Sequence, residues 1–80
     1  MRLLLLPLLA ATAAGAARAD EAGECRDGIA MIRAELQKAR AEPVRTALRK
    51  HLRIAEREQD EAEFDECLDA VKDARRALGR

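Results

Sequence analysis

Two cysteines and a single histidine are the side chains that could support redox, nucleophilic or metal chemistry in this chain, namely Cys25, Cys67 and His51. The sequence contains no serine, so a Ser–His nucleophile is excluded. The two cysteines lie far apart, whereas redox motifs usually hold their thiols close together, as in C-x-x-C. Zinc sites show paired ligands at short spacing, which these three residues lack. We therefore expect no catalytic residues, no cofactor, and a histidine on the surface or partly packed.

The cysteines favour a structural disulfide. An even number of cysteines in an exported chain usually pairs. Two cysteines allow one intramolecular connectivity, so we predict a Cys25–Cys67 disulfide, with an intermolecular bridge as the alternative. Closing a loop of this length constrains the unfolded chain by about 4 kcal/mol in the chain-entropy model. That is a large contribution for a domain near the lower size limit for a self-sufficient core.

The N-terminus has the three parts of a signal peptide: Arg2, an apolar run over residues 3–14, and the small-x-small pattern Ala17-Arg18-Ala19. A membrane-spanning helix needs about 20 apolar residues, and this run is shorter. We therefore predict a signal peptide over residues 1–19, cleaved after Ala19, with Ala14-Gly15-Ala16 as an alternative frame. The predicted location is periplasmic or secreted, and no stable membrane insertion is expected after cleavage.

Composition indicates one small helical domain over residues 20–80. Removal of residues 1–19 takes away two arginines and no acid, so the formal charge falls from +0 to −2. That balance, together with the absence of Trp and Tyr, argues against nucleic acid as a partner. Ala, Arg and Glu are good helix formers and dominate the domain. The bias towards Ala, and towards Arg over Lys, is typical of a GC-rich bacterial genome.

Apolar periodicity predicts an up-down-up three-helix bundle with helices at about 27–41, 44–58 and 61–78. Residues 20–24 read as a loose polar leader, with Asp27 as a candidate N-cap. Pro43 separates the first two helices because the residue before a proline avoids the α region. Asp60 and Glu63 have capping-box spacing at the start of the third helix. Gly79 and the basic residues before it are typical of a helix end.

The second turn is the less certain boundary, because no glycine or proline marks it. The apolar stripe that ends at Ala55 and the one that begins at Phe64 are about half a turn out of phase, which favours a break. A two-helix hairpin with one long or bent helix over 44–78 is the alternative architecture.

Two rows of charge lie on either side of this turn. Residues four apart form a basic row before it and an acidic row after it: Arg45, Arg49, Arg53 and Arg57, then Glu61, Asp65, Asp69 and Asp73. If the chain folds back near Gln59, the two rows are expected to face each other and to attract. Each exposed pair contributes only about 0–1 kcal/mol, so this attraction would tune orientation rather than supply stability.

The acidic stretch is also the sharpest candidate for ligand binding. Carboxylates are the ligands that hard cations such as calcium prefer. Glu61, Asp65 and Asp69 are the candidate metal ligands, although the stretch lacks the glycine and the alternating spacing of an EF-hand loop. A solvated helix face is the simpler interpretation, because charge runs are commonly that.

From the sequence we therefore expect a small exported, disulfide-stapled, all-α protein that is not an enzyme. It is expected to act through contacts of its helix surfaces with a protein partner or with a second copy of itself. Weak binding of a divalent or trivalent metal ion through the acidic third helix is the alternative function.

Overall fold

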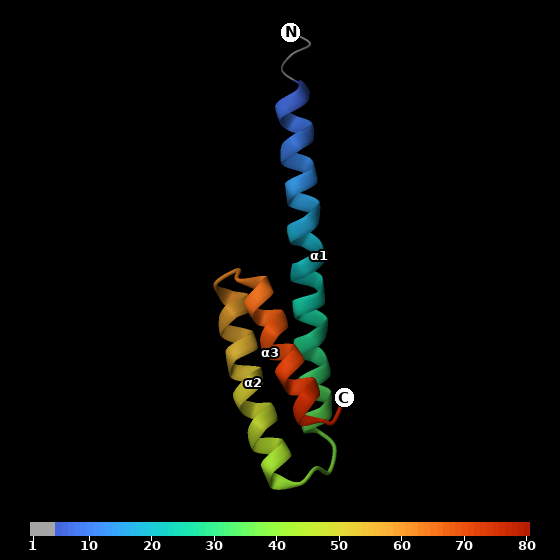
Figure 1. The fold of residues 1–80 in the computed structure, drawn as a ribbon, viewed down its shortest axis with the longest axis vertical. Helices are drawn as coiled ribbons and strands as arrows, with labels where there is room; N and C mark the ends of the chain where they lie inside the picture. Colours follow the sequence, from blue (N-terminus) through green and yellow to red (C-terminus); the bar gives the residue numbers. More distant parts are fainter. Residues whose placement is uncertain (1–4) are drawn as a thin grey trace.

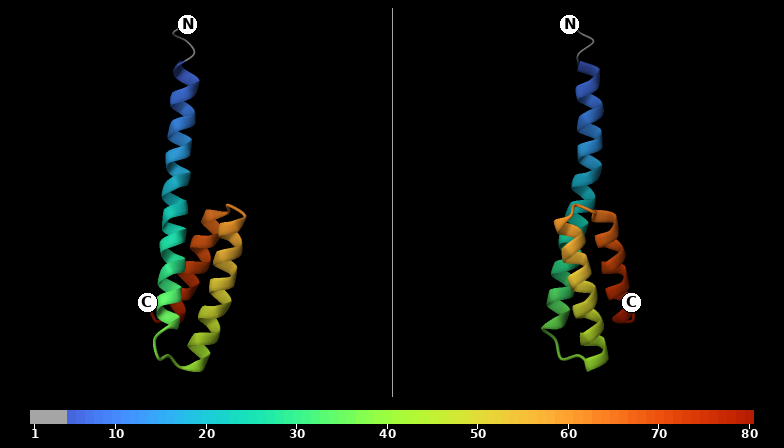
Figure 2. Two further views of the ribbon diagram at one scale, coloured as in Figure 1. Left: turned by 180° about the vertical axis from the view of Figure 1, so that it is seen from behind. Right: turned by 90° about the vertical axis from the view of Figure 1, so that its left-hand side faces the viewer.

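The computed structural model describes the backbone of residues 5–80 and the side chains of residues 20–80. Within that part of the chain the structure consists of three helices, α1 (Leu5–Leu36), α2 (Glu42–Asp60) and α3 (Phe64–Ala77). They run up, down and up, and each helix packs against the other two (Figures 1 and 2). The predicted three-helix bundle is confirmed, and the alternative with a single helix over 44–78 is wrong.

Helix α1 is longer than predicted. Residues 20–24, expected to be a loose leader, are helical, and Asp27 lies well inside α1 rather than at its N-cap. Tertiary packing stabilises this part of the helix, because Cys25 is buried and is bonded to Cys67 of α3. Gly23 costs only about 1 kcal/mol in a helix interior and does not break it. Figure 1 shows α1 extending beyond the turn that joins the other two helices.

The predicted signal peptide over residues 1–19 stays a prediction. Residues 1–4 lie outside the described part of the chain, and so do the side chains of residues 5–19. If cleavage follows Ala19, the exported chain begins inside α1. The part of α1 that remains, from Asp20 to Leu36, is comparable in length to α2, which has 19 residues.

Helix α1 ends at Leu36, earlier than the predicted boundary at residue 41. Side chains that follow α1 in the sequence form hydrogen bonds with its last turn. The guanidinium Nη1 of Arg45 donates a hydrogen bond to the carbonyl oxygen of Leu36 at 3.0 Å. Lys38 and Arg40 both donate to the buried carboxylate of Glu35. The Arg45 bond offsets one unpaired carbonyl of the helix end, and the bonds to Glu35 hold the start of the 37–41 loop against the last turn of α1.

Helix α2 begins at Glu42 with Pro43 in its first turn, where the missing N–H costs nothing. Its end is a Schellman motif: the N–H of Glu63 donates to the carbonyl of Glu58, and that of Ala62 to the carbonyl of Gln59. Ala62 therefore adopts a φ of 58°, in the left-handed region that favours glycine.

Helix α3 begins at Phe64, with Glu63 rather than Asp60 at its N-cap and no side-chain capping bond. The predicted capping box is therefore wrong, because Asp60 is still the last residue of α2. A second Schellman motif closes α3, with bonds from Gly79 to Arg76 and from Arg80 to Arg75. Gly79 has a φ of 82°, so it supplies the predicted stop.

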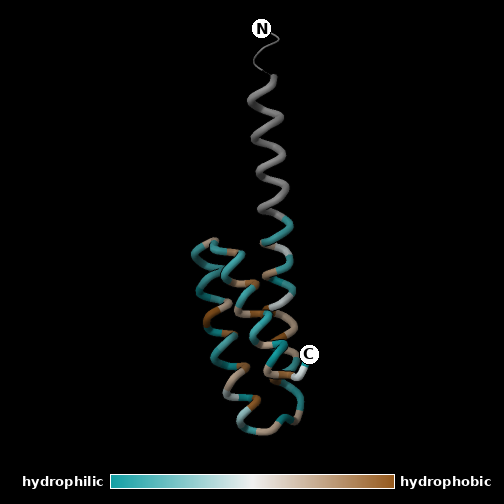
Figure 3. The backbone as a smooth tube through the Cα atoms, viewed as in Figure 1, coloured by the Kyte–Doolittle hydropathy of each residue, from teal (hydrophilic) through white to brown (hydrophobic). Residues whose placement is uncertain are grey.

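The core is small and is built largely from short side chains. Figure 3 shows hydrophilic residues along all three helices of residues 20–80, with hydrophobic positions scattered between them. Because these side chains are short, the helices pack closely. A Cβ added to Gly28 of α1 would lie 2.6 Å from both methyl carbons of Val71 in α3. Among residues 20–80, the buried apolar side chains are Cys25, Ile29, Ile32, Leu48, Ala55, Cys67, Ala70, Val71 and Ala74.

Candidate functional site

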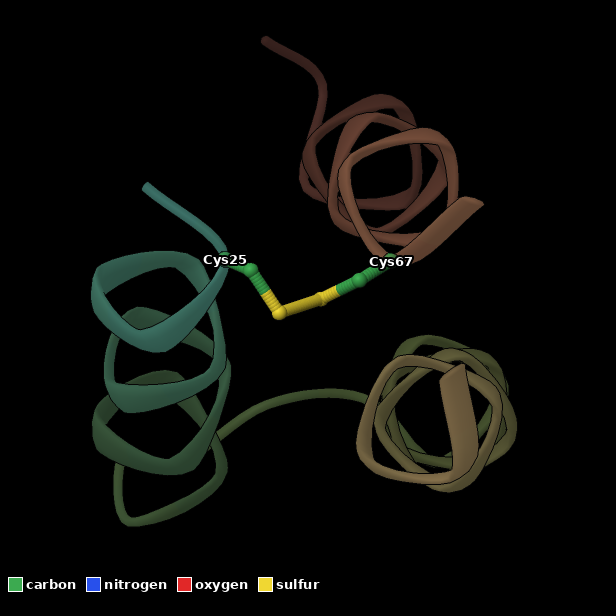
Figure 4. Close-up of a disulfide and its surroundings, with 2 residues drawn as sticks. All are labelled: Cys25 and Cys67. Atoms are coloured by element: carbon green, nitrogen blue, oxygen red, sulfur yellow. A yellow bond between two sulfur atoms is a disulfide. The ribbon is translucent and has the colours of Figure 1, made fainter. Parts of the chain in front are cut away.

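The structure contains the predicted disulfide between Cys25 of α1 and Cys67 of α3. Its Cα atoms are 5.8 Å apart, and it closes a sequence separation of 42 residues. Both cysteines are 0% exposed, and their sulfur atoms lie between α1 and α3 (Figure 4). Thiol–disulfide exchange requires access of a thiolate to one sulfur atom. The buried position therefore favours a structural role over redox exchange.

His51 lies on α2 and is half-buried, which agrees with the expectation of a partly packed histidine. Its Nδ1 atom is buried and, among the described residues, has no hydrogen-bond partner. Because both cysteines are in the disulfide, no thiol is left to form a Cys–His pair. His51 therefore has no cysteine thiol as a partner.

The three predicted metal ligands, Glu61, Asp65 and Asp69, are all exposed. In the part of the chain with described side chains, no group of three or more His, Cys, Asp or Glu residues could hold a metal ion. The structure therefore does not bring these three carboxylates together as a site.

A different acidic residue is buried close to the turn between α2 and α3. Glu58 of α2 is 8% exposed and faces the carboxyl groups of Glu66 and Glu61. Hydrogen bonding with Glu66, burial, and hydrogen bonding with Glu61 together raise the pKa of Glu58 to about 7. Sequence reasoning grouped Glu58 with the exposed acids. Its helical position three residues after the buried Ala55 was the signal that could have separated it.

The expected facing of the basic and acidic rows is wrong. Among the described residues no ion pair joins α2 to α3. Arg45 and Arg49 reach back to Glu42, and Arg57 lies 4.0 Å from its neighbour Glu58. A step of four residues turns about 40° beyond a full helical turn, so each row winds around its helix and cannot follow a neighbour. Arg33 of α1 does form an ion pair with Glu56 of α2.

Charge is instead segregated along the bundle axis. We call residues 20–27 and 56–69 the turn end, because they surround the α2–α3 turn, and residues 28–55 and 70–80 the opposite end. The turn end carries 12 acidic and 2 basic side chains, whereas the opposite end carries 3 acidic and 11 basic ones. The near-neutral chain is therefore a strongly dipolar molecule.

The buried carboxylate of Glu35 organises the opposite end. Glu35 is 4% exposed and accepts hydrogen bonds from Lys38 at 2.9 Å, from Arg40, and from Arg80 at 3.3 Å. The hydrogen bond from Lys38, assisted by Arg40, lowers the pKa of Glu35 although burial opposes the shift. This network ties the end of α1 to the loop and to the C-terminus. The spacing of its four residues along the chain is uneven, so the sequence pattern gives no sign of this network.

No pocket opens on the surface formed by the described residues. Within the same part of the chain, no helix has both the length and the apolarity that crossing a membrane requires. Comparison with protein families, curated proteins and solved structures finds no match to this chain. The features on which a function can be argued are therefore the disulfide, the two charged ends and the surfaces of the helices.

Proposed function

We propose that the chain is a small exported, non-enzymatic protein that acts through contact of its charged helix surfaces with another protein chain. The observation that carries this proposal is the segregation of charge. The turn end has a formal charge of −10 and the opposite end +8. Opposed patches of this kind steer association and fix orientation between partners.

The way the basic residues are used supports the proposal. Lys50 and Arg53 of α2 are exposed, and among the described residues neither has a carboxylate partner. Their charges are therefore available to an acidic surface. In contrast, Arg40 forms an ion pair with the buried Glu35.

The buried disulfide suits a chain that is exported. An oxidising compartment allows the bond to form, and the bond offsets the small size of the apolar core. A stable bundle then presents its surface residues in fixed positions, which reduces the entropy lost on binding a partner.

The proposal is tested by photo-crosslinking in cells that export the protein. A photoreactive phenylalanine analogue replaces Ala34 of α1, Arg53 of α2 or Asp69 of α3, each of which is exposed. Irradiation is expected to yield an adduct heavier than the monomer for at least one position, with an unirradiated sample as the control. Monomer alone at all three positions would contradict the proposal.

A further inference from the structure

The outer surface formed by α1, the loop after it and α3 has the same charge polarity as the whole bundle. These two helices run in the same direction and meet at Gly28 and Val71 (Figure 2). The surface residues that flank this contact define what we call the α1–α3 face. On α1 they follow three- and four-residue steps and are Asp20, Glu24, Asp27, Met31 and Ala34, and the same spacing continues to Lys38 in the loop after α1.

The corresponding stripe on α3 also begins with an acidic side chain at the turn end. Asp65 is followed by Leu68, and then by Lys72 and Arg75. On α3 the order from the turn end is acid, then an apolar residue, then base. On α1 the acids are followed by Met31 and Ala34, and the base Lys38 lies in the loop just beyond the helix, where it donates a hydrogen bond to Glu35. Met31 and Leu68 are both partly exposed hydrophobic residues that pack against the core, so the middle of this face is apolar.

The apolar middle lies at a defined level along the bundle. The disulfide places Cys25 and Cys67 at the same level. Leu68 lies one residue beyond Cys67, whereas Met31 lies six residues beyond Cys25. Gly28 and Val71, which are in contact, lie between these two levels. An axis through that contact therefore has the acidic residues of both helices on one side and the basic residues on the other.

We propose that this face binds a second copy of the chain in an antiparallel, two-fold symmetric dimer. A two-fold axis across the face at the level of Gly28 and Val71 turns the acidic part of each copy towards the basic part of the other. The same rotation brings Met31 and Leu68 of both copies to the middle of the interface. This isologous contact closes on itself, so it makes a dimer rather than a filament. The inference rests on the proposed function and names the partner.

The other faces fit a second copy less well. The α2–α3 face carries Glu66, Asp69 and Asp73 on α3, so its acids continue into the opposite end. On the α1–α2 face, Arg33 already pairs with Glu56. On neither face are the acids both confined to the turn end and free of ion pairs between the two helices.

The test compares the dissociation constants of charge-reversal variants by sedimentation equilibrium on the disulfide-bonded, exported protein. One variant carries Asp27→Lys and Asp65→Lys, which places a base next to the apolar middle on both helices and leaves Asp20 and Glu24 as the acids of the face. The other carries Lys72→Glu and Arg75→Glu, which makes most of it acidic. Each variant alone is expected to dimerise at least tenfold more weakly than the parent, because like charges then oppose each other. An equimolar mixture of the two is expected to recover a dimer, because the altered ends are again complementary.

Two matched controls change charge elsewhere. Asp69 lies about 200° around α3 from Val71, on the side away from α1, and Arg53 lies on α2. Asp69→Lys and Arg53→Glu are expected to leave the dissociation constant within threefold of the parent value. If a reversal variant does not fold, as judged by circular dichroism, Asp27→Asn with Lys72→Gln replaces it and is expected to weaken the dimer at least threefold.

A parent chain that stays monomeric from micromolar to millimolar concentration would overturn the inference. An unchanged dissociation constant in the reversal variants, or a mixture that does not dimerise, would also overturn it. The two proposals can fail independently. A monomeric parent chain would remove the dimer, whereas photo-crosslinks to a different protein chain would still support the proposed function.

Discussion

Gly28 of α1 and Val71 of α3 are in such close contact that a Cβ on Gly28 would lie 2.6 Å from each Val71 methyl carbon. The contact sits one helical turn beyond the disulfide and lies at the middle of the α1–α3 face. It explains a glycine inside a helix, where this residue costs about 1 kcal/mol relative to alanine. The lower helix propensity of Gly28 is offset because a residue without a side chain lets the backbones of α1 and α3 approach closely.

Gly28→Ala is expected to destabilise the bundle despite the better helix propensity of alanine. Overpacking costs about 1–3 kcal/mol, and the β-branched Val71 has little rotamer freedom with which to move away. Chemical denaturation of Gly28→Ala, of Val71→Ala and of the double variant measures the coupling. The double variant is expected to be more stable than the sum of the two single effects predicts. Strict additivity would show that the close contact carries no energetic weight.

Removal of the disulfide is expected to cost about 2–5 kcal/mol, the usual range for a small exported domain. The variant Cys25→Ala with Cys67→Ala keeps the buried sites small and apolar. For a core this sparse, such a loss brings the domain close to unfolding at growth temperature. Circular dichroism melting of parent and variant measures the change, with reduced parent protein as the matched control. A variant that melts like the oxidised parent would contradict the assigned role.

Ala62→Gly is expected to stabilise the bundle by about 1 kcal/mol, because the left-handed conformation at φ 58° penalises a side chain. Gly79 occupies the same position in the Schellman motif that closes α3, with a φ of 82°. Gly79→Ala is therefore the mirror experiment and is expected to lose a similar amount. Thermal melts of both variants should shift in opposite directions by about 4–8 °C.

The two buried carboxyl groups predict opposite responses to pH. The pKa of Glu58 rises from its usual 4.5 to about 7 in the folded chain, so its stabilising contribution is present below pH 4.5 and is lost as pH rises through about 7. The pKa of Glu35 is lowered, so its contribution is present above its usual 4.5 and is lost as pH falls through the lower folded value. Stability is therefore expected to be greatest near pH 5.

Urea denaturation between pH 3 and pH 8 measures this profile. Glu58→Gln is expected to remove the decline in stability between about pH 5 and pH 7, because its amide does not titrate. Glu35→Gln is expected to reduce the loss at acid pH while lowering stability at neutral pH. A parent protein whose stability rises steadily from pH 5 to pH 8 would rule out the assigned shift at Glu58.

Several features of the fold were predictable from local chemistry. Apolar periodicity and Pro43 correctly indicated three helices, and the two cysteines indicated their own pairing. The boundaries were less accurate for physical reasons. Asp27 resembles an N-cap only if the helix begins there, and upstream residues that form helix removed that condition. The turn at Ala62 was hard to locate because an alanine occupies a position where glycine is usual.

The arrangement of charge was the main feature that sequence reasoning placed incorrectly. Rows such as Arg45 to Arg57 are evenly spaced along the chain, and this spacing suggested that they face a neighbouring helix. The winding of each row around its helix prevents that. Segregation along the axis depends on which residues of three helices share a level, and the levels follow from the packed structure. The buried positions of Glu35 and Glu58 depend on the same packing.

The intact mass of the protein recovered from the exported fraction tests whether this chain is an exported bundle held by one internal disulfide. The mass is measured with alkylation, before and after reduction. We expect a chain that starts at Asp20, that is two hydrogens lighter than its reduced form, and that accepts two alkyl groups only after reduction. A retained N-terminus, or two thiols that react without reductant, would contradict the account.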